Sequence, residues 1–402
     1  MKNLNSKNIC LIMPTYFHAN PRSIRIARAL VQEGYHLDII CFNDSSFARE
    51  NQTQLQGVNV HTLAIERRKT GKARYLVEYL IFSILAFIKM SQLFHYRRFS
   101  LVHVNNPPDS LVFITVCHKW IYGCRVLLDI SEPLSKSYAK KFSESRGFFL
   151  QFLDWIQLAA CRYADRVITV SRAFQQELVR IGVAKTQISI LANSPDKTFF
   201  DPDVIKNRKR DFGYEQKFVI LYQGAVTPER GIDILVDTVD NLKADIPHIL
   251  GIIVGAGSLL PYLQDLVIKK GLENYITITG FLPPREVPAY VAMADICLLM
   301  AKKIPVYELY SPDKLFEYMT FRKMIIAPRL QGIIDITGDD GVLLYEPGDA
   351  ADLTDKILYC YHNPDLVKEY IGKAELIFQP YRWENTRREL YHCYDLLLNN
   401  KR

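Results

Sequence analysis

Short apolar runs alternate with amphipathic segments along almost the whole chain, and this alternation limits the folds open to it. The first half contains ICLIMP, LDIICF, VNVHTL, LVHVN, VLLDI, RVITV and ISILAN. A second series contains FVILYQG, HILGIIVGAG, ITITGF, ICLLM, MIIAP and GVLLYE. Runs of this length and composition predict buried strands, and the amphipathic segments between them predict helices. The repeated order of strand and helix is typical of parallel sheets covered by helices, so we expect an α/β fold.

A polar stretch between Asn193 and Lys217 separates the two series and contains prolines and many charged residues. This composition is typical of a domain linker, and 402 residues exceed what one hydrophobic core usually supports. We therefore predict one Rossmann-like domain at 1–200 and a second at 201–378. The last segment, 379–402, has apolar residues at helical spacing and is expected to form a C-terminal helix.

Charge and cysteine usage restrict the partners and the compartment. The net charge of +7 at pH 7 favours an anionic partner, such as a membrane surface or nucleotide phosphates. Eight cysteines without a C-x-x-C pair, and no signal-peptide core near the start, indicate a reducing cytoplasm. The most membrane-like segment, 75–94, is interrupted by Glu78 and Lys89, so we expect a helix buried in the first domain and not a transmembrane span.

A basic cluster comes directly before that apolar segment. Cations beside an apolar helix suit a protein that rests on an anionic membrane, each contributing about 1 kcal/mol. The alternative is a solvated loop. We predict peripheral, salt-sensitive attachment to the inner face of the cytoplasmic membrane. The residues of this cluster are Arg67, Arg68, Lys69, Lys72 and Arg74.

The stretch YSPDKLFEYMTFRKMIIAP combines a helix start with charged residues. Ser311 is a candidate N-cap, and Pro312 suits the first turn. Backbone N–H groups and the positive dipole end make a helix N-terminus a seat for phosphate. A cation in YQGAVTPERGIDIL, Arg230, follows a predicted strand that ends at Gly224, and could bind a diphosphate there. A dehydrogenase is disfavoured because no strand leads into a G-x-G-x-x-G motif.

These segments, in their order and spacing, resemble the family 4 retaining glycosyltransferases of the GT-B fold. The resemblance rests on ADRVITVSRAFQQEL, ISILANSPD, ILYQGAVTPERGIDIL, IIVGAGSLL, ITITGFLPPREVPAYVAMADICLL and SPDKLFEYMTFRKMIIAP, and covers nearly the whole chain. It implies two Rossmann-like domains that face each other across a cleft, with the C-terminal helix crossing back to the first. It also implies a nucleotide-diphosphate sugar in the second domain and an acceptor in the first. Fixed dipoles and cations can stabilise the departing diphosphate, so we expect neither a metal nor another cofactor.

The resemblance assigns the donor-binding roles by position. The helix start would hold the diphosphate and sugar, Glu317 the ribose hydroxyls, Arg230 the phosphates, and Gly280 with Phe281 the base. Ala225 stands where the family commonly has an arginine or lysine, so other cations must carry more of the phosphate charge. The donor-binding candidates are Gly224, Arg230, Gly255, Gly280, Phe281, Ser311, Asp313, Lys314, Leu315 and Glu317.

Three carboxylates are the catalytic candidates. Asp129 and Glu132 lie in VLLDISEPLSKS, where many members of the family have Asp-x-His-Glu and this chain has Ser131 in place of the histidine. A helix or turn cap is an equally weighted alternative for Asp129. Glu308 adjoins Leu309, which occupies the first position of the family's usual pair of glutamates. The acceptor-binding candidates are Arg22, Asn105 and Asp109.

The expected activity is transfer of a sugar, with retention, by a glycosyltransferase of the hexosyltransferase type. UDP is the favoured donor nucleotide, and the acceptor is expected to be a glycan or lipid-linked molecule of surface polysaccharide or lipopolysaccharide biosynthesis. No segment indicates a nucleic-acid partner. Two alternatives stay open: a sugar-nucleotide epimerase of the same fold, and a catalytically weak binding or scaffold subunit, which Ser131, Ala225 and Leu309 suggest.

Overall fold

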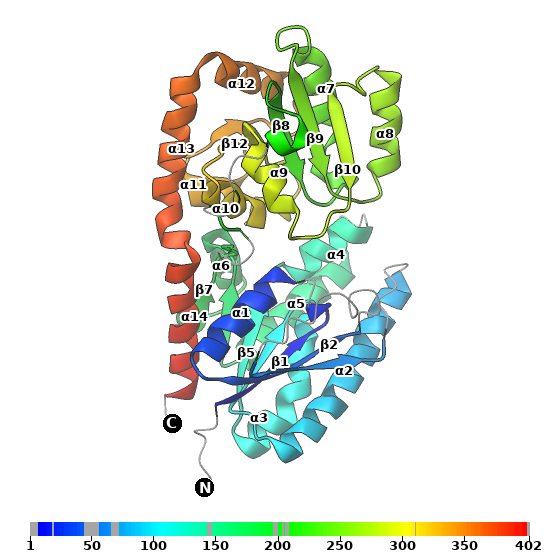
Figure 1. The fold of residues 1–402 in the computed structure, drawn as a ribbon. Helices are drawn as coiled ribbons and strands as arrows, with labels where there is room; N and C mark the ends of the chain where they lie inside the picture. Colours follow the sequence, from blue (N-terminus) through cyan, green and yellow to red (C-terminus); the bar gives the residue numbers. More distant parts are fainter. Residues whose placement is uncertain are drawn as a thin grey trace. The chain divides into compact units, whose positions relative to one another are not determined.

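The computed structural model describes residues 7–17, 20–43, 56–65, 72–142, 147–195, 200–202, 205, 209–309 and 311–399. The chain forms two compact units, Met1–Ala192 with Thr386–Arg402, and Asn193–Asn385. The second unit therefore begins a few residues before the predicted boundary at 200/201. The C-terminal segment that belongs to the first unit begins at Thr386 and not at 379. Each unit contains a parallel sheet with helices, which confirms the predicted α/β fold class (Figure 1).

The described part of the first unit contains a seven-stranded sheet in the order β3-β2-β1-β4-β5-β6-β7, with all neighbours parallel. The chain builds outward from β1 to β3 and then returns to the other side of β1 with β4. The strand order therefore reverses between β1 and β4, where ligands of open α/β sheets usually bind. The strands are β1 (Asn8–Met13), β2 (His36–Phe42), β3 (Val58–Leu63), β4 (Leu101–Asn105), β5 (Arg125–Ile130), β6 (Arg166–Thr169) and β7 (Ile188–Ile190).

Two helices of the first unit begin at a side-chain N-cap. The Asn20 side chain accepts a hydrogen bond from the Ser23 N–H at the start of α1, and Ser171 caps α6 in the same way through Phe174 N–H. The helices are α1 (Pro21–Gln32), α2 (Lys72–Tyr96), α3 (Val116–Tyr122), α4 (Leu134–Phe142), α5 (Phe148–Tyr163), α6 (Arg172–Arg180) and α14 (Trp383–Leu398), with 3-10 turns at η2 (Asp109–Thr115) and η3 (Lys185–Gln187).

The long helix α2 differs from its predicted environment. By length and composition it could cross a membrane over Leu76–Tyr96, where its mean hydropathy is 1.6, and 28% of the window is buried. Length and composition alone do not make this helix a span, so the expectation that 75–94 does not cross a membrane stays a prediction. The expectation of a buried helix holds for one face only, which includes the fully buried Phe82. The opposite face is exposed and apolar.

The second half of α14 packs on the first unit through polar and apolar contacts. The Tyr394 hydroxyl lies 2.8 Å from Nδ1 of His103 on β4, and both side chains are fully buried. The Tyr391 hydroxyl donates to the carbonyl of Ala29 on α1 at 3.2 Å. These contacts join the C-terminal segment to a strand and a helix that lie far away in the sequence.

The described part of the second unit contains a six-stranded parallel sheet in the order β10-β9-β8-β11-β12-β13. Its order reverses between β8 and β11. The strands are β8 (Phe218–Gln223), β9 (Ile249–Val254), β10 (Ile276–Gly280), β11 (Ile296–Leu298), β12 (Met324–Pro328) and β13 (Leu343–Tyr345). The helices are α7 (Asp233–Leu242), α8 (Leu260–Lys269), α9 (Val287–Met293), α10 (Asp313–Thr320), α11 (Gln331–Thr337), α12 (Ala350–His362) and α13 (Pro364–Phe378), with 3-10 turns at η4 (Arg210–Phe212), η5 (Pro228–Arg230), η6 (Tyr307–Leu309) and η7 (Gln379–Tyr381).

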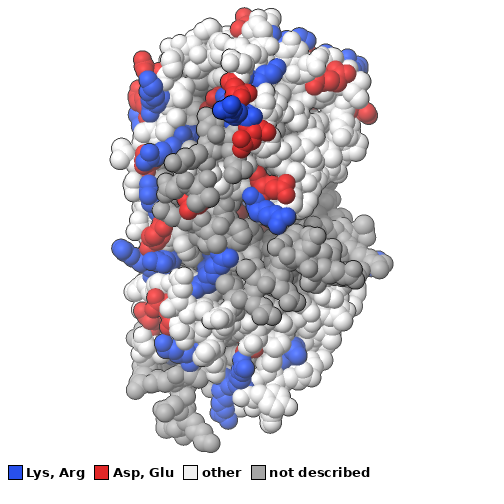
Figure 2. Space-filling model, in the orientation of Figure 1, with Lys and Arg blue, Asp and Glu red and all other residues white. Residues whose placement is uncertain are grey.

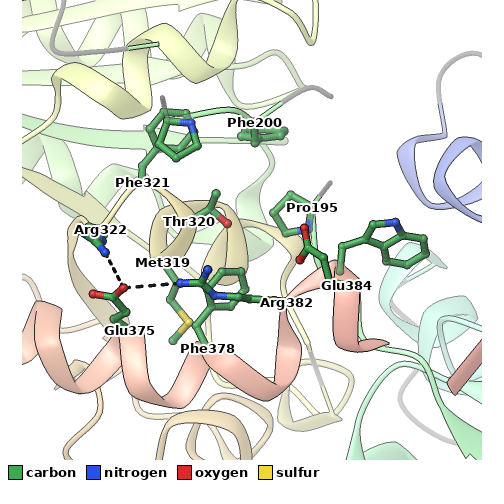
Figure 3. Close-up of a pocket in the computed structure, with 12 residues that line it drawn as sticks. Pro195, Phe200, Met319, Thr320, Phe321, Arg322, Glu375, Phe378, Arg382 and Glu384 are labelled. Atoms are coloured by element: carbon green, nitrogen blue, oxygen red, sulfur yellow. Dashed lines mark hydrogen bonds and ion pairs between the residues drawn. The ribbon is translucent and has the colours of Figure 1, made fainter. Parts of the chain in front are cut away.

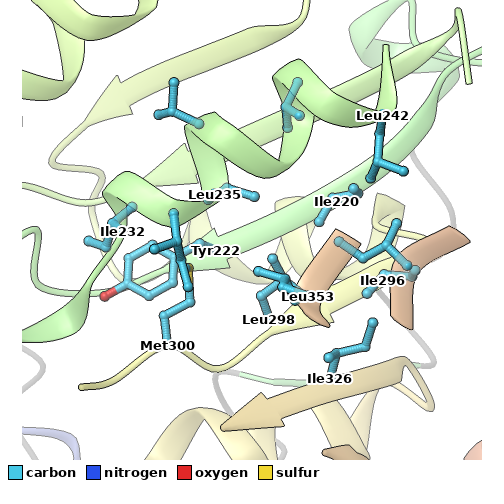
Figure 4. Close-up of a cluster of buried hydrophobic side chains, with 14 of the residues drawn as sticks. Ile220, Tyr222, Ile232, Leu235, Leu242, Ile296, Leu298, Met300, Ile326 and Leu353 are labelled. Carbon is cyan, nitrogen blue, oxygen red and sulfur yellow. The ribbon is translucent and has the colours of Figure 1, made fainter. Parts of the chain in front are cut away.

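The core of the second unit lies between its sheet and the helices α7 and α12 (Figure 4). Ile220 of β8, Leu298 of β11 and Ile326 of β12 are fully buried, and they pack in one cluster with Leu235 of α7 and Leu353 of α12. Burial of each such side chain contributes about 1.5 to 3 kcal/mol. This packing holds the strands rigidly, so their carboxyl ends can position side chains for binding.

We predict that Tyr394→Phe lowers the free energy of unfolding by about 1 to 3 kcal/mol, because it leaves buried Nδ1 of His103 without its partner. Tyr391→Phe is the matched control, and we expect a smaller loss because that hydroxyl is only partly buried. Denaturant unfolding of both variants provides the measurement. An equal loss of unfolding free energy in the two variants would show that the contact with His103 contributes no more to stability than the contact with Ala29.

Candidate functional site

The carboxyl edge of the second sheet brings a glycine and a lysine together where the strand order reverses. Gly224 follows β8 directly and has φ +136°, a conformation that side chains rarely adopt. A Cβ atom at Gly224 would meet Cε of Lys314 and would lie 2.9 Å from its Nζ. Lys314 is in the first turn of α10, so its side chain lies against the backbone at the end of β8. In the described chain, no acidic side chain forms an ion pair with Lys314.

A second cation faces the same place. Arg230 and Lys314 both line a small cavity of about 10 Å³, together with Tyr222, Met300 and Pro328 among others. A space of this size holds about one water molecule. The Arg230 guanidinium lies 4.7 Å from the ring centroid of Tyr307, a cation–π contact that orients it. Two cations thus meet near the N-terminal end of α10, an arrangement that suits a diphosphate.

Glu317 is held at the same sheet edge. Its Oε2 accepts a hydrogen bond of 2.6 Å from Nε2 of Gln223, the last residue of β8, whose side chain is only 5% exposed. This bond ties α10 to β8 across the reversal point. The structure therefore brings together Gly224, Arg230, Lys314 and Glu317, four of the predicted donor-binding residues. Gln223 was missed, although a polar residue closing an apolar strand could have indicated it.

The start of α10 differs from the prediction. The N-cap position is occupied by Pro312, with no side-chain cap bond, and the helix begins at Asp313. Ser311 as N-cap was therefore wrong, because the extended Pro312 places the serine one residue too early. The Ser311 side chain is instead buried, and its hydroxyl has no hydrogen-bond partner within the described residues. Leu315 is fully buried and belongs to the core on the inner side of α10.

Two glycines that follow β9 allow close backbone packing, and the first of them, Gly255, is a predicted donor-binding residue. A Cβ at Gly255 would overlap the carbonyl oxygen of Gly224, and a Cβ at Gly257 would overlap that of Val226. The Gly255 N–H donates to the Gly280 carbonyl at 2.9 Å. Gly280 has φ +73° with open space around it, and the Phe281 side chain that follows is 66% exposed. An exposed ring at this edge is available to stack on a base.

Glu308 contacts the start of a helix. Its Oε2 accepts a hydrogen bond of 2.9 Å from the backbone N–H of Gln331, at the start of α11. The carboxylate therefore caps that helix, where the helix dipole favours a negative charge. A catalytic role of Glu308 stays a prediction. Leu309 lies beside it in η6.

Asp129 is the centre of a buried ion pair in the first unit. Nε and Nη2 of Arg22 donate to its two carboxylate oxygens at 3.0 and 2.9 Å, and Nη1 of Arg22 donates to the Leu191 carbonyl at 2.8 Å. Complete burial opposes ionisation, yet the Arg22 charge and the nearby His103 hold the pKa of Asp129 at about 2. This pair joins α1, β5 and the segment after β7. It gives Asp129 and Arg22 a structural role, and their predicted roles in catalysis and acceptor binding stay predictions.

The other predicted site residues of the first unit differ in how far they are buried. Asp109 is fully buried, and its Oδ2 accepts from Nε2 of Gln157 at 2.9 Å. Burial raises the pKa of Asp109 to about 7 against the opposing effect of its hydrogen bonds. Asn105 is also buried and donates to the Ser23 hydroxyl at 3.4 Å. Both side chains are buried, and their predicted role in acceptor binding stays a prediction. Glu132 is exposed and accepts from the Ser137 hydroxyl at 2.7 Å.

The basic cluster is only partly within the described residues. Arg67, Arg68 and Lys69 lie outside them, and Lys72 begins α2. Nε of Arg74 donates to Oε1 of Glu78 at 3.1 Å, so part of its charge is compensated. In the part of the chain that the structure describes, no group of three or more His, Cys, Asp or Glu side chains could hold a metal ion.

A larger cavity lies in the second unit, apart from the residues above (Figure 3). Its volume is about 380 Å³, and Phe200, Phe321 and Trp383 contribute aromatic side chains to its wall. Nη2 of Arg322 and Nη2 of Arg382 lie 2.7 and 3.5 Å from the same oxygen of Glu375. Its lining includes none of the predicted donor-binding residues, so it is a separate feature.

Two family models match the chain and together span both units. Residues 22–198 match Glycosyltransferase Family 4, and residues 217–363 match Glycosyl transferases group 1. Among solved structures, Anabaena HepE in complex with UDP has a TM-score of 0.70 at 17% identity, covering 97% of this chain and all of that one. Sucrose-phosphate synthase from Thermosynechococcus elongatus has a TM-score of 0.76 at 17% identity, covering 98% of this chain and all of that one. The fold is therefore that of the GT-B glycosyltransferases.

Curated relatives agree with this class. The alpha-D-kanosaminyltransferase of Streptomyces kanamyceticus is 23% identical over 53% of this chain, and the match spans only 55% of that relative's length. The uncharacterized glycosyltransferase MJ1607 of Methanocaldococcus jannaschii is 21% identical over 93% of both chains. A putative colanic acid biosynthesis glycosyl transferase of Escherichia coli, WcaI, is 28% identical over 38% of this chain and 37% of its own length. The chain is a GT-B glycosyltransferase of the family 4 type.

The buried carboxyl group of Asp109 should make stability depend on pH. The folded state keeps it protonated up to about pH 7, whereas an unfolded aspartate ionises near pH 4. The free energy of unfolding should therefore fall as pH rises from about 4 to 7 and then level, by at most ~4 kcal/mol. Asp109→Asn should remove this fall, so its stability relative to wild type should rise across the same window.

Denaturant unfolding at several pH values is the measurement. The exposed Asp265→Asn, on α8, removes a carboxylate without burial and should leave the profile unchanged. An Asp109→Asn profile that parallels wild type across this range would show that Asp109 is ionised in the folded protein.

Proposed function

We propose that the second unit binds a nucleotide-diphosphate sugar at the carboxyl edge of β8 and that the enzyme transfers its sugar with retention. The observation that carries this proposal is the meeting of Arg230 and Lys314 near the N-terminal end of α10. Glycosyl transfer leaves a diphosphate whose charge must be stabilised. Preorganised cations and helix N–H groups supply that stabilisation in a site where water competes poorly. Glu317, tied to β8 by Gln223, is placed to accept from ribose hydroxyls.

UDP is the proposed nucleotide. HepE, which shares this fold, has been solved with UDP, with UDP and glucose, and with UDP-glucose. These complexes support a sugar-nucleotide donor for a chain of this fold. The exposed Phe281 beside Gly280 is proposed to meet the base, where an aromatic ring binds by stacking and does not by itself select uracil.

The proposed acceptor is a glycan or lipid-linked molecule of surface polysaccharide or lipopolysaccharide biosynthesis. The name of WcaI, which refers to colanic acid biosynthesis, supports this class. We also propose a cytoplasmic enzyme that works at the inner face of the cytoplasmic membrane, with the basic cluster supplying attraction to anionic lipid. Among the first-unit candidates, Glu132 is the exposed carboxylate that remains for a role near the acceptor.

Variants of the donor site should separate charge from sugar recognition. Lys314→Ala and Arg230→Ala should weaken UDP binding by about 10- to 100-fold, since hydrogen bonds to charged groups contribute about 1.5 to 3 kcal/mol. Neither should change uridine binding much. Glu317→Gln should weaken both ligands, because the ribose is common to them. Titration calorimetry with UDP and uridine makes the comparison.

The matched control is Lys303→Ala, which removes an exposed cation from the loop between β11 and α10. It should leave UDP affinity unchanged. If Lys314→Ala and Lys303→Ala had the same small effect, a general charge effect would explain the data. If Glu317→Gln lowered only the melting temperature, Glu317 would be a structural residue and not a ribose ligand.

Turnover should not require a divalent metal. We expect release of UDP from a UDP-sugar only when an acceptor is supplied, at a rate that EDTA does not change, because Arg230 and Lys314 supply the positive charge. A coupled UDP-release assay with and without EDTA tests this. Loss of activity with EDTA and recovery with Mn²⁺ would contradict the metal-independent proposal. UDP binding without turnover on any acceptor would favour the scaffold alternative.

A further inference from the structure

Helix α2 is apolar on two sides, and only one of them is covered. Phe82, Ala86 and Met90 recur every four residues on the inner face, and all three are fully buried. The helix packs with them against β2, β3 and η2. The outer face of a surface helix is normally polar. On α2 this face carries six apolar side chains that are between 42 and 61% exposed. They are Leu76, Val77, Leu80, Ile81, Ile84 and Ile88.

Helix α3, which lies beside α2, also exposes apolar side chains. The two helices are neighbours, because the ring centroids of Phe94 and Tyr122 are 4.8 Å apart and those of Phe87 and His118 are 6.0 Å apart. On α3, Trp120 is 79% exposed and Ile121 is 70% exposed. We call the exposed apolar side chains of α2 and α3 the outer apolar face. Large exposed apolar surfaces are rare on soluble monomers and mark interaction sites.

The charges around the outer apolar face have one dominant sign. Residues 72–98 contain five basic residues and one acidic residue, Glu78, to which Arg74 is bonded. Arg97 approaches Asp38 at 3.6 Å. At the far end of α2, the Arg98 guanidinium lies 5.6 Å from the Tyr122 ring centroid. In Figure 2, charged side chains on the visible lower surface are sparse and mostly basic.

This combination selects an anionic lipid bilayer as the occupant. An apolar face with Trp and Tyr at its edge and cations around it matches the boundary between headgroups and acyl chains. A second copy of the chain fits less well, since it would bring two sets of like charges together. A transmembrane position of α2 also fits less well, because its inner face packs on the sheet of its own unit.

We propose that the outer apolar face inserts into the surface of an anionic bilayer, with α2 lying parallel to it. This inference rests on the proposed function only in that a lipid-linked acceptor would explain the location. Binding to lipid requires neither donor nor acceptor. The proposal assigns membrane binding to the outer apolar face, whereas the sequence indicated only the basic cluster.

Flotation with vesicles tests the proposal. The face variant is Leu80→Glu with Ile84→Glu, and the matched control is Leu376→Glu with Ile268→Glu, which changes the same residue types on α13 and α8 at 73 and 63% exposure. Wild type and control should float with vesicles of equal parts phosphatidylcholine and phosphatidylglycerol. The face variant should bind to the vesicles at least about tenfold less, because it lacks two aliphatic side chains that would become buried in the bilayer. Leu80→Ser with Ile84→Ser should show the loss without added charge.

Fluorescence supplies a second readout that does not depend on those substitutions. Addition of the anionic vesicles should shift tryptophan emission to the blue, and Trp120→Phe should abolish most of the shift, leaving Trp155 and Trp383. Thermal unfolding of every variant shows whether the protein is folded. A face variant that unfolds like the control but does not bind vesicles supports the proposal whether or not the enzyme's donor is a UDP-sugar.

Three outcomes would overturn the proposal. The first is equal flotation of the face variant and the control. The second is equal binding to pure phosphatidylcholine, which would remove the role of anionic lipid. The third is a wild-type dimer that binds no vesicles and that the face variant converts to a monomer, which would assign the outer apolar face to self-association.

Discussion

The close approach of two loops at the edge of the second sheet is the constraint on which the candidate donor site depends. The loop after β9 passes against the backbone after β8, and Gly255 and Gly257 are needed there because a Cβ would overlap the carbonyl oxygens of Gly224 and Val226. The Val226 N–H then donates to the Ala256 carbonyl at 3.0 Å. This packing fixes Gly224 in its left-handed conformation, and the space that Gly224 leaves is filled by Lys314. A cation is thereby held beside the end of a helix.

In the first unit, a buried ion pair has the corresponding role in stability. Arg22 and Asp129 form a bidentate pair next to His103, which in turn lies against Tyr394 of the C-terminal helix. Burial alone would favour a neutral carboxyl group, and Arg22 is what keeps Asp129 charged. Asp109 is buried without such a cation, so its pKa moves in the opposite direction. The two aspartates thus differ because Asp129 has Arg22 and His103 beside it and Asp109 has no cation among its described neighbours.

The two proposals concern different units and different forces. The donor site depends on charges that are preorganised by rigid backbone, whereas the outer apolar face depends on surface area and on the sign of the charges around it. A glycosyltransferase with a lipid-linked acceptor would use both. Helix α2 can provide a membrane-facing surface because its other side already closes the core, so the exposed apolar side chains are not required for folding.

The sequence by itself determined the α/β class and the two series of parallel strands. These follow from local patterns, since strand period, turn residues and helix starts are set within a few positions. The four residues that meet at the candidate donor site were indicated by the resemblance to a family, and their roles stay a prediction. Tertiary structure alone decided the roles of Asp129, Arg22, Asp109 and Glu308, because each depends on a partner distant in the chain: Arg22 lies 107 residues from Asp129, and Gln331 lies 23 residues from Glu308. It also decided which side of α2 is covered. A helix that is apolar all round has no periodic signal to show its inner face, and only packing against the sheet distinguishes the two sides.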